Sequence, residues 1–197
     1  LDIQHENGYV PPVVPGRFDG PTINGPWWGG MIAFLPSRLY NYYADEEVLK
    51  NSYPAIKKFV DYLSSIAKDN IVEWGLGDWL EPGSVNMRPK TTPVPVTSTI
   101  AYYNYAKLTS DLAKRYGDKG NVSKYAKLAE QIKKSYNEKF LNKITGEYAL
   151  GSQASQLLSL YFNLVPDKYN KLVRQALLKK IEKDNYHLNT GFVSTPF

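Results

Sequence analysis

Amphipathic helical stripes that come in pairs are the feature that most restricts the fold of this chain. Apolar residues recur every three or four positions over residues 49–67, which is the spacing of one buried helix face. Asp45 is expected to cap this helix, and Pro54 to bend it. A similar stripe over residues 31–43, interrupted by Pro36, precedes it after a link of one or two residues. The two stripes predict a helical hairpin.

The same plan repeats twice along the chain. Residues 98–116 and 122–140 carry helical stripes that are joined by a short turn with two glycines. Residues 153–162 and 167–183 form the third pair, and Pro166 between them suits the first turn of the second helix. Three helical hairpins in sequence predict an all-α fold.

Long and short connections alternate along these hairpins. Because antiparallel helices reverse direction, every second connection emerges at the same end of the assembly. The long connections cover residues 1–30, 68–97, 141–152 and 184–197. They hold or adjoin most of the chemically informative side chains, namely all four tryptophans, Asp78, Glu81, Tyr148, Gln153 and His187. We therefore expect the long connections to converge on one functional surface.

Two glycine-containing loops, Pro26–Gly30 and Trp74–Leu80, contain all four tryptophans. Indole faces can stack on the apolar face of a pyranose, while a nearby carboxylate accepts hydrogen bonds from its hydroxyl groups. Asp78 supplies such a carboxylate in the second loop. Trp27 and Trp74 are predicted to be packing residues. The pattern predicts carbohydrate binding, provided that the two loops lie together.

The composition argues against several other classes of function. The net charge of +5 comes from 24 basic and 19 acidic residues that are interspersed, so no basic stripe indicates nucleic-acid binding. No apolar run approaches the roughly 20 residues that span a bilayer. The chain lacks cysteine, and its two histidines, His5 and His187, have no metal-ligand spacing around them. We expect no nucleic acid, no membrane, no metal and no cofactor.

Short motifs that span the whole chain occur in the order found in one enzyme family. They are Trp28-Gly29-Gly30, Leu39-Tyr40, Val60-Asp61-Tyr62-Leu63, Gly77-Asp78-Trp79-Leu80, Thr99-Ile100-Ala101-Tyr102-Tyr103, Tyr136-Asn137-Glu138-Lys139-Phe140, Gly151-Ser152-Gln153 and His187-Leu188-Asn189-Thr190-Gly191-Phe192. Together they resemble the catalytic domain of α-L-rhamnosidases, glycoside hydrolase family 78. Several ordered motifs are more specific than any one of them.

The resemblance implies an (α/α)6 toroid of six helical hairpins, of which the three predicted hairpins are about half. Residues 1–197 are then expected to form a single partial catalytic domain, truncated at both ends. The longer protein is expected to be a glycosidase that removes α-L-rhamnose from glycans or glycosides by inversion. Its partner is a rhamnose-containing carbohydrate.

The resemblance also implies that the catalytic carboxylates lie outside this chain. In the family the general acid is a glutamate in an Arg-Asp-Glu-Arg type motif before the Trp-Gly segment. The general base is a glutamate in a Thr-x-Trp-Glu type segment beyond the region that matches residues 187–197. Neither motif occurs in this sequence. We expect no catalytic residue here, and the piece alone is expected to be inactive.

Substrate binding falls, by the resemblance, to Trp28, Asp78, Trp79 and His187. Trp28 and Trp79 match tryptophans that pack around rhamnose, and Asp78 matches the aspartate before the second of them. One departure is Gly30, because family members commonly carry aspartate there. Without that carboxylate the site lacks a hydroxyl contact or a loop anchor.

Other roles stay open for the polar residues. Asp78 can instead bond backbone amides and tie its loop, and His187 at a helix end can be structural. Glu73 and Glu81 flank Asp78, so an acid/base set within this loop can be considered. Such a set has little support, because carboxylates in one loop give no sign of opposed placement across a sugar.

Two further classes of function are alternatives. The longer protein could be a non-catalytic carbohydrate-binding relative, or the chain could be a helical scaffold in which the tryptophans only staple hairpins. The lack of a fixed-period repeat argues against the scaffold. A half-barrel leaves helix faces uncovered, so exposed apolar surface or self-association is expected. For the longer protein we expect a bacterial periplasmic or extracellular location.

Overall fold

The computed structural model describes residues 3–13, 24–84 and 89–197, so parts of the first two long connections lie outside the described residues. Within these ranges the chain is helical, and its only β-type contacts are two isolated bridges. The helices are α1 (Pro26–Gly29), α2 (Met31–Tyr43), α3 (Glu46–Ile66), α4 (Val94–Arg115), α5 (Lys119–Phe140), α6 (Gln153–Tyr161) and α7 (Asn170–Lys183), with a 3-10 turn η1 over Asp167–Tyr169. The all-α prediction is confirmed.

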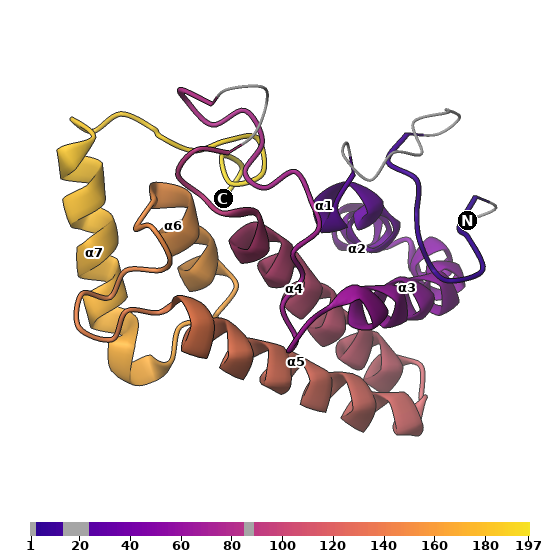
Figure 1. The fold of residues 1–197 in the computed structure, drawn as a ribbon. Helices are drawn as coiled ribbons and strands as arrows, with labels where there is room; N and C mark the ends of the chain where they lie inside the picture. The colour runs from indigo at the N-terminus through magenta and orange to yellow at the C-terminus, as the bar shows by residue number, and fades with distance from the viewer. Residues whose placement is uncertain (1–2, 14–23, 85–88) are drawn as a thin grey trace.

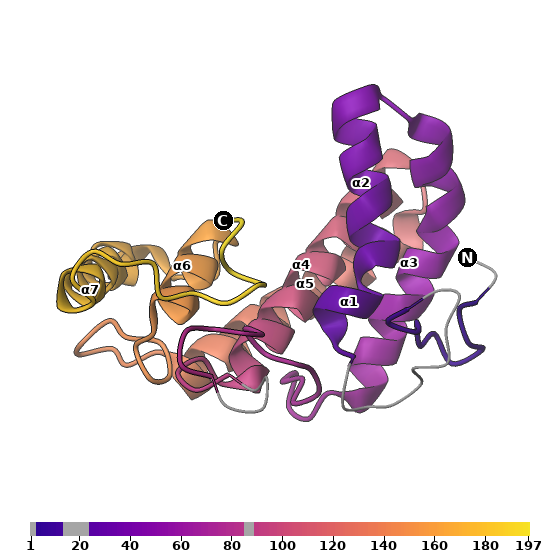
Figure 2. The ribbon, with the colours of Figure 1, turned by 90° about the horizontal axis from the view of Figure 1, so that it is seen from above.

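The long helices pack as three hairpins, α2 with α3, α4 with α5, and α6 with α7. Seen from above, the hairpins follow one another along an arc, with α6 and α7 at one end and α2 and α3 at the other (Figure 2). The middle hairpin joins the two ends, because α4 contacts both α3 and α6. This arrangement is the predicted part of an α/α toroid.

Local capping explains several of the helix boundaries. The Asp45 carboxylate accepts a hydrogen bond from the Val48 backbone amide at 3.0 Å, as predicted for the N-cap of α3. Ser152 caps α6 in the same way through the Ser155 amide at 3.1 Å. Ala44 adopts a left-handed conformation with φ of 56°, which gives the tight link between α2 and α3.

Several boundaries differ from the sequence prediction, and one of them is the start of α7, which lies at Asn170 after the turn η1 rather than at Asp167. The segment Pro26–Gly29 was expected to be a loop but forms the short helix α1. α4 begins at Val94 rather than at Ser98, because Pro95 fits the first turn of a helix, where no amide donor is needed. α5 begins at Lys119 rather than at Val122, and its first turn is polar, so it shows no apolar periodicity.

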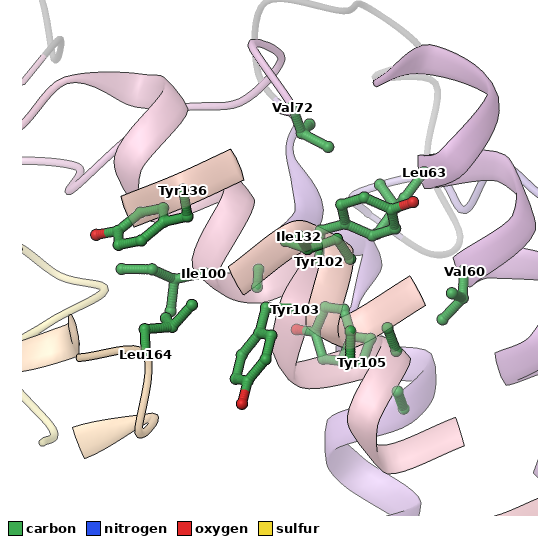
Figure 3. Close-up of a cluster of buried hydrophobic side chains, with 14 of the residues drawn as sticks. Val60, Leu63, Val72, Ile100, Tyr102, Tyr103, Tyr105, Ile132, Tyr136 and Leu164 are labelled. Carbon is green, nitrogen blue, oxygen red and sulfur yellow. The ribbon is translucent and has the colours of Figure 1, made fainter. Parts of the chain in front are cut away.

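The hydrophobic core surrounds α4. Ile100, Tyr102, Tyr103 and Tyr105 of α4 are buried there, against Ile132 and Tyr136 of α5 and Val60 and Leu63 of α3 (Figure 3). The buried tyrosines carry hydroxyl groups that need partners. The Tyr102 hydroxyl donates to Ser64 Oγ at 2.7 Å, and Tyr136 pairs with Ser159 at 2.7 Å. Burial raises the pKa of both tyrosines, so both remain neutral hydrogen-bonding groups.

Large apolar side chains remain exposed along the arc, as expected for a partial toroid. Met31 and Leu35 of α2 are 46% and 51% exposed, Tyr161 of α6 is 51% exposed, and Leu178 of α7 is 60% exposed. Among the described helices, none has the length and apolar character that a membrane crossing requires.

Candidate functional site

Three aromatic rings from distant parts of the chain meet at one surface. Trp28 lies in α1, Trp79 in the connection after α3, and Phe192 in the C-terminal loop (residues 190–197). The Trp28 and Trp79 ring centroids are 5.9 Å apart at 83°. Phe192 stacks on Trp28 at 6.4 Å and 26°, and meets Trp79 edge-on at 6.0 Å. These three residues, the aromatic cluster, confirm that the first, second and fourth long connections converge.

The helical turn of α1 directs its two tryptophans to different surroundings. The Trp27 indole nitrogen donates to the Thr97 carbonyl at 3.0 Å, and the Trp27 ring packs against Phe162 and Phe197. These contacts fit the predicted packing role of Trp27. The ring of Trp28, one residue later, packs against Trp79 and Phe192 instead. α1 can lie directly on the second loop because Gly25 has no side chain, since a Cβ there would be 2.7 Å from Gly75 Cα.

Asp78 is fully buried and holds the C-terminal loop. Its Oδ2 accepts hydrogen bonds from the Gly191 amide at 2.7 Å and from Ser194 Oγ at 2.5 Å. Its Oδ1 accepts from the Ser194 amide at 3.0 Å. This carboxylate could contact a sugar hydroxyl group or anchor a loop, and the geometry favours anchoring. The loop that it anchors is the C-terminal loop rather than its own.

Phe192 is the member of the aromatic cluster that the sequence alone did not single out. Its amide donates to the Trp79 carbonyl at 2.6 Å, and its side chain is 64% exposed. The neighbouring Gly191 allows this close approach, because a Cβ there would lie 2.3 Å from the Asp78 carbonyl oxygen. The signal was present in the Gly191-Phe192 end of the last motif, but nothing local links that motif to Trp28 or Trp79.

His187 lies just beyond α7, at the start of the segment that runs to the C-terminal loop, and is exposed. Its backbone carbonyl accepts a hydrogen bond from Gln153 Nε2 at 2.9 Å. Gln153 also donates to Asp184 at 2.6 Å and accepts from the Asn189 amide at 3.2 Å. This buried glutamine therefore fixes the path of the segment, while the ring contacts of the aromatic cluster do not include His187.

The other carboxylates of the second long connection are occupied elsewhere. Glu81 is buried, accepts from the backbone amides of Lys90 and Thr91, and accepts from Thr91 Oγ1 at 3.0 Å. Glu73 is exposed and pairs with Lys139 at 3.1 Å. These contacts give no support to an acid/base set with Asp78. In the described part of the chain, no group of three or more metal-ligating side chains is present.

A cavity of about 510 Å³ opens beside the aromatic cluster. Its lining is mostly apolar and comes from α1, α2, α4, the end of α6 and the C-terminal loop, including Trp28, Phe34, Arg38, Tyr105, Phe192 and Phe197. Arg38 lies over the Phe34 ring at 4.7 Å. This surface can bind an apolar or amphipathic ligand by stacking, but it presents no pair of free carboxylates.

The sequence model of the bacterial alpha-L-rhamnosidase six-hairpin glycosidase domain matches residues 1–197. The chain belongs to this family. Among curated relatives of the six-hairpin domain, the alpha-L-rhamnosidase of Formosa agariphila is 31% identical over 98% of this chain. That of Alteromonas sp. is 30% identical, also over 98% of the chain. The chain spans about a fifth of the length of these relatives, 21% and 22% respectively.

Solved structures of alpha-L-rhamnosidases share the fold. The alpha-L-rhamnosidase from Dictyoglumus thermophilum is 37% identical and aligns with a TM-score of 0.90, covering 98% of this chain and 22% of that structure. The Streptomyces avermitilis alpha-L-rhamnosidase, solved in complex with L-rhamnose, is 28% identical with a TM-score of 0.84. The alignment covers 99% of this chain and 18% of that structure. The resemblance seen in the ordered motifs is confirmed.

Proposed function

We propose that this chain is part of the catalytic (α/α)6 domain of a glycoside hydrolase that removes α-L-rhamnose from glycans or glycosides. The observation that carries the proposal is the meeting of Trp28, Trp79 and Phe192 in a member of the six-hairpin rhamnosidase family. The L-rhamnose complex of the Streptomyces avermitilis relative supports rhamnose as the sugar.

The aromatic cluster is proposed to hold the sugar by its apolar parts. Trp28 and Trp79 stand nearly perpendicular to each other, so together they form a corner that suits the ring face and the methyl group of rhamnose. His187 is proposed to hydrogen-bond a sugar hydroxyl group from the segment that leads to Phe192. Asp78 is buried, and it is proposed to support the same sugar site.

An inverting mechanism needs a carboxylic acid to protonate the leaving oxygen and a carboxylate to activate water on the opposite face of the sugar. The two carboxyl groups of such an enzyme are about 6.5–9.5 Å apart. Asp78, Glu81 and Glu73 are engaged in structural contacts. Because the acid and base motifs of the family also do not occur in this sequence, we place the general acid and base outside residues 1–197. The chain is then a single partial domain that continues at both ends in a longer protein, and it is inactive alone.

Release of nitrophenol from an aryl α-L-rhamnoside tests this proposal. The longer protein, with flanking sequence on both sides, and the 197-residue chain are assayed side by side. Activity in the longer protein alone is expected. Activity in the short chain would contradict the placement of the acid and base. If neither protein releases nitrophenol but the longer protein binds rhamnose, the non-catalytic sugar-binding alternative holds.

A tryptophan pair separates sugar binding from a scaffold role. Trp79→Ala in the longer protein is expected to weaken rhamnose binding while most of the fold survives. The matched control is Trp74→Ala, because Trp74 packs against Tyr9 and Tyr62 at 6.0 and 5.9 Å. That variant is expected to lower stability with little change in affinity. If Trp79→Ala lowers only stability, the scaffold alternative is favoured.

Self-association of the isolated chain is also proposed. The exposed apolar residues of α2, α6 and α7 lie along the arc that further hairpins would complete, and exposed apolar patches favour association. Light scattering is expected to detect species larger than a monomer. A strictly monomeric chain that binds no apolar dye would contradict this proposal.

A further inference from the structure

Two segments separated by more than a hundred residues are joined around Asp78. The carboxylate accepts hydrogen bonds from the Gly191 amide, the Ser194 amide and the Ser194 hydroxyl group. The sequence separations are 113 and 116 residues. Because Asp78 is fully buried, these contacts are shielded from water and from salt, and a charged acceptor strengthens each of them.

The joined segment is tied internally as well. Thr195 donates to the Gly191 carbonyl with both its amide, at 3.1 Å, and its hydroxyl group, at 2.7 Å. Thr190 and Thr195 share a further hydrogen bond at 2.8 Å. Residues 190–195 therefore behave as one turn, and a contact with either Gly191 or Ser194 fixes the whole turn.

Phe192 lies at the exposed side of this turn. Its amide bonds the Trp79 carbonyl, and its ring completes the aromatic cluster beside Trp28 and Trp79. Phe192 is 64% exposed, so packing of its side chain alone holds the ring weakly. The position of the ring is instead set through the backbone that Asp78 holds.

We propose that Asp78 is a positioning residue, which fixes the C-terminal loop so that Phe192 forms the third wall of the sugar site. Asp78 then acts on substrate through Phe192 and does not contact the sugar. The inference rests on the proposed function, because it assigns a role within that sugar site. It adds Phe192 to the proposed sugar contacts and gives the buried carboxylate a purpose beyond stability.

Kinetics of the longer protein with an aryl α-L-rhamnoside test the role of Asp78. Asp78→Asn replaces one acceptor oxygen by a donor that faces the Gly191 and Ser194 donors, and Phe192→Ala removes the wall directly. Each is expected to raise KM about tenfold with kcat changed less than about twofold, because binding to the ring face is lost. Ser194→Ala removes one of the three contacts and is expected to raise KM by a smaller factor.

The double variant decides between positioning and direct contact. If Asp78 acts through Phe192, Asp78→Asn with Phe192→Ala raises KM by about as much as either change alone. If Asp78 contacts the sugar independently, the two effects multiply to about a hundredfold, and the proposal is overturned. The matched control is Glu81→Gln, since Glu81 is also buried and accepts two backbone amides, yet they belong to Lys90 and Thr91. It is expected to leave KM near the wild-type value.

Hydrogen exchange provides a readout that does not need activity. In the longer protein, the amides of residues 190–195 are expected to exchange faster in Asp78→Asn than in wild type, while those of α4 stay protected. Unchanged exchange in this turn would overturn the inference even if KM rises. If wild type releases no nitrophenol, the proposed function fails and the exchange result alone decides whether Asp78 orders the turn. If Asp78→Asn does not fold, Ser194→Ala is read by the same two measurements.

Discussion

The hydroxyl group of Tyr105 lies where a side chain on Gly30 would have to stand. A Cβ on residue 30 would be 2.1 Å from the Tyr105 oxygen and 2.2 Å from the Pro26 carbonyl oxygen. Both distances are far below van der Waals contact. Gly30 stands where aspartate is common in this motif, and the packing around Gly30 leaves no room for a side chain. A single substitution therefore cannot place an aspartate at this position.

Gly30→Ala is expected to lower the free energy of unfolding by about 1–3 kcal/mol, the usual range for overpacking a buried position. The clash with the Pro26 carbonyl involves backbone, which cannot move away cheaply. Chemical denaturation of the variant measures the effect. Gly120→Ala is the control, because nothing lies within 4 Å of a Cβ there and the site is helical. Equal destabilisation of both variants would contradict the steric explanation.

Tyr105→Phe is expected to leave stability unchanged or raise it by about 1 kcal/mol. The Tyr105 hydroxyl is buried without a hydrogen-bond partner among the described residues, and an unsatisfied buried donor is costly. Tyr136→Phe removes a hydroxyl group that is buried and bonded to Ser159, so it is expected to lower stability by about 1 kcal/mol. The two melting temperatures should move in opposite directions or differ clearly. A large loss of stability in Tyr105→Phe would contradict the assignment of its hydroxyl group as an unsatisfied donor.

Asp118 links the first hairpin to the second and makes stability depend on acidity. Hydrogen bonds from Asn121, Lys57 and Tyr53 lower the pKa of Asp118 from 3.8 to about 2. Because the folded pKa lies below the unfolded one, the stabilisation is complete above about pH 4 and is lost as the pH falls through about 2.

Melting curves of wild type and Asp118→Asn test this dependence. The difference between their melting temperatures is expected to be constant near neutral pH and to shrink as the pH falls from about 4 to about 2. Asp61→Asn offers a comparison, since Asp61 also pairs with a lysine, Lys124, at 2.8 Å and is half exposed. A constant difference for Asp118→Asn at all pH values would show that its carboxylate does not titrate in this range.

Asn137→Ala is expected to lower the free energy of unfolding by about 2–3 kcal/mol. The buried Asn137 amide donates to the Leu164 carbonyl at 2.9 Å and accepts from the Tyr148 hydroxyl at 2.5 Å, so its removal leaves two buried polar groups without partners. The control Asn142→Ala removes an exposed turn residue that accepts from two amides. A similar loss in both variants would contradict the importance of burial.

The hairpins were predictable because their signal is local. The apolar spacing of α3 and the Asp45 cap are read from neighbouring residues, and both are found in the structure. Helix starts were less predictable where the first turn is polar, as at Lys119, or opens with proline, as at Val94. Apolar periodicity reports the buried face of a helix, and the polar first turn of α5 has none.

The candidate site was predictable only in part, since its members meet through tertiary packing. The glycine-containing loops around the tryptophans indicated Trp28 and Trp79, which are half-buried in the structure. No local pattern could pair Asp78 with Gly191 and Ser194, which follow it by more than a hundred residues. Phe192 could not be singled out from the sequence for the same reason, because its place in the aromatic cluster depends on its neighbours in space.

The central position of α4 has a consequence for how this molecule unfolds. α4 contacts α1, α3, α5 and α6, so this one helix packs against both outer hairpins. Each outer hairpin can then open while the rest stays intact, and fraying should begin at the two ends of the arc and move inward. α4 holds the arc together, and loss of its packing would free both outer hairpins at once.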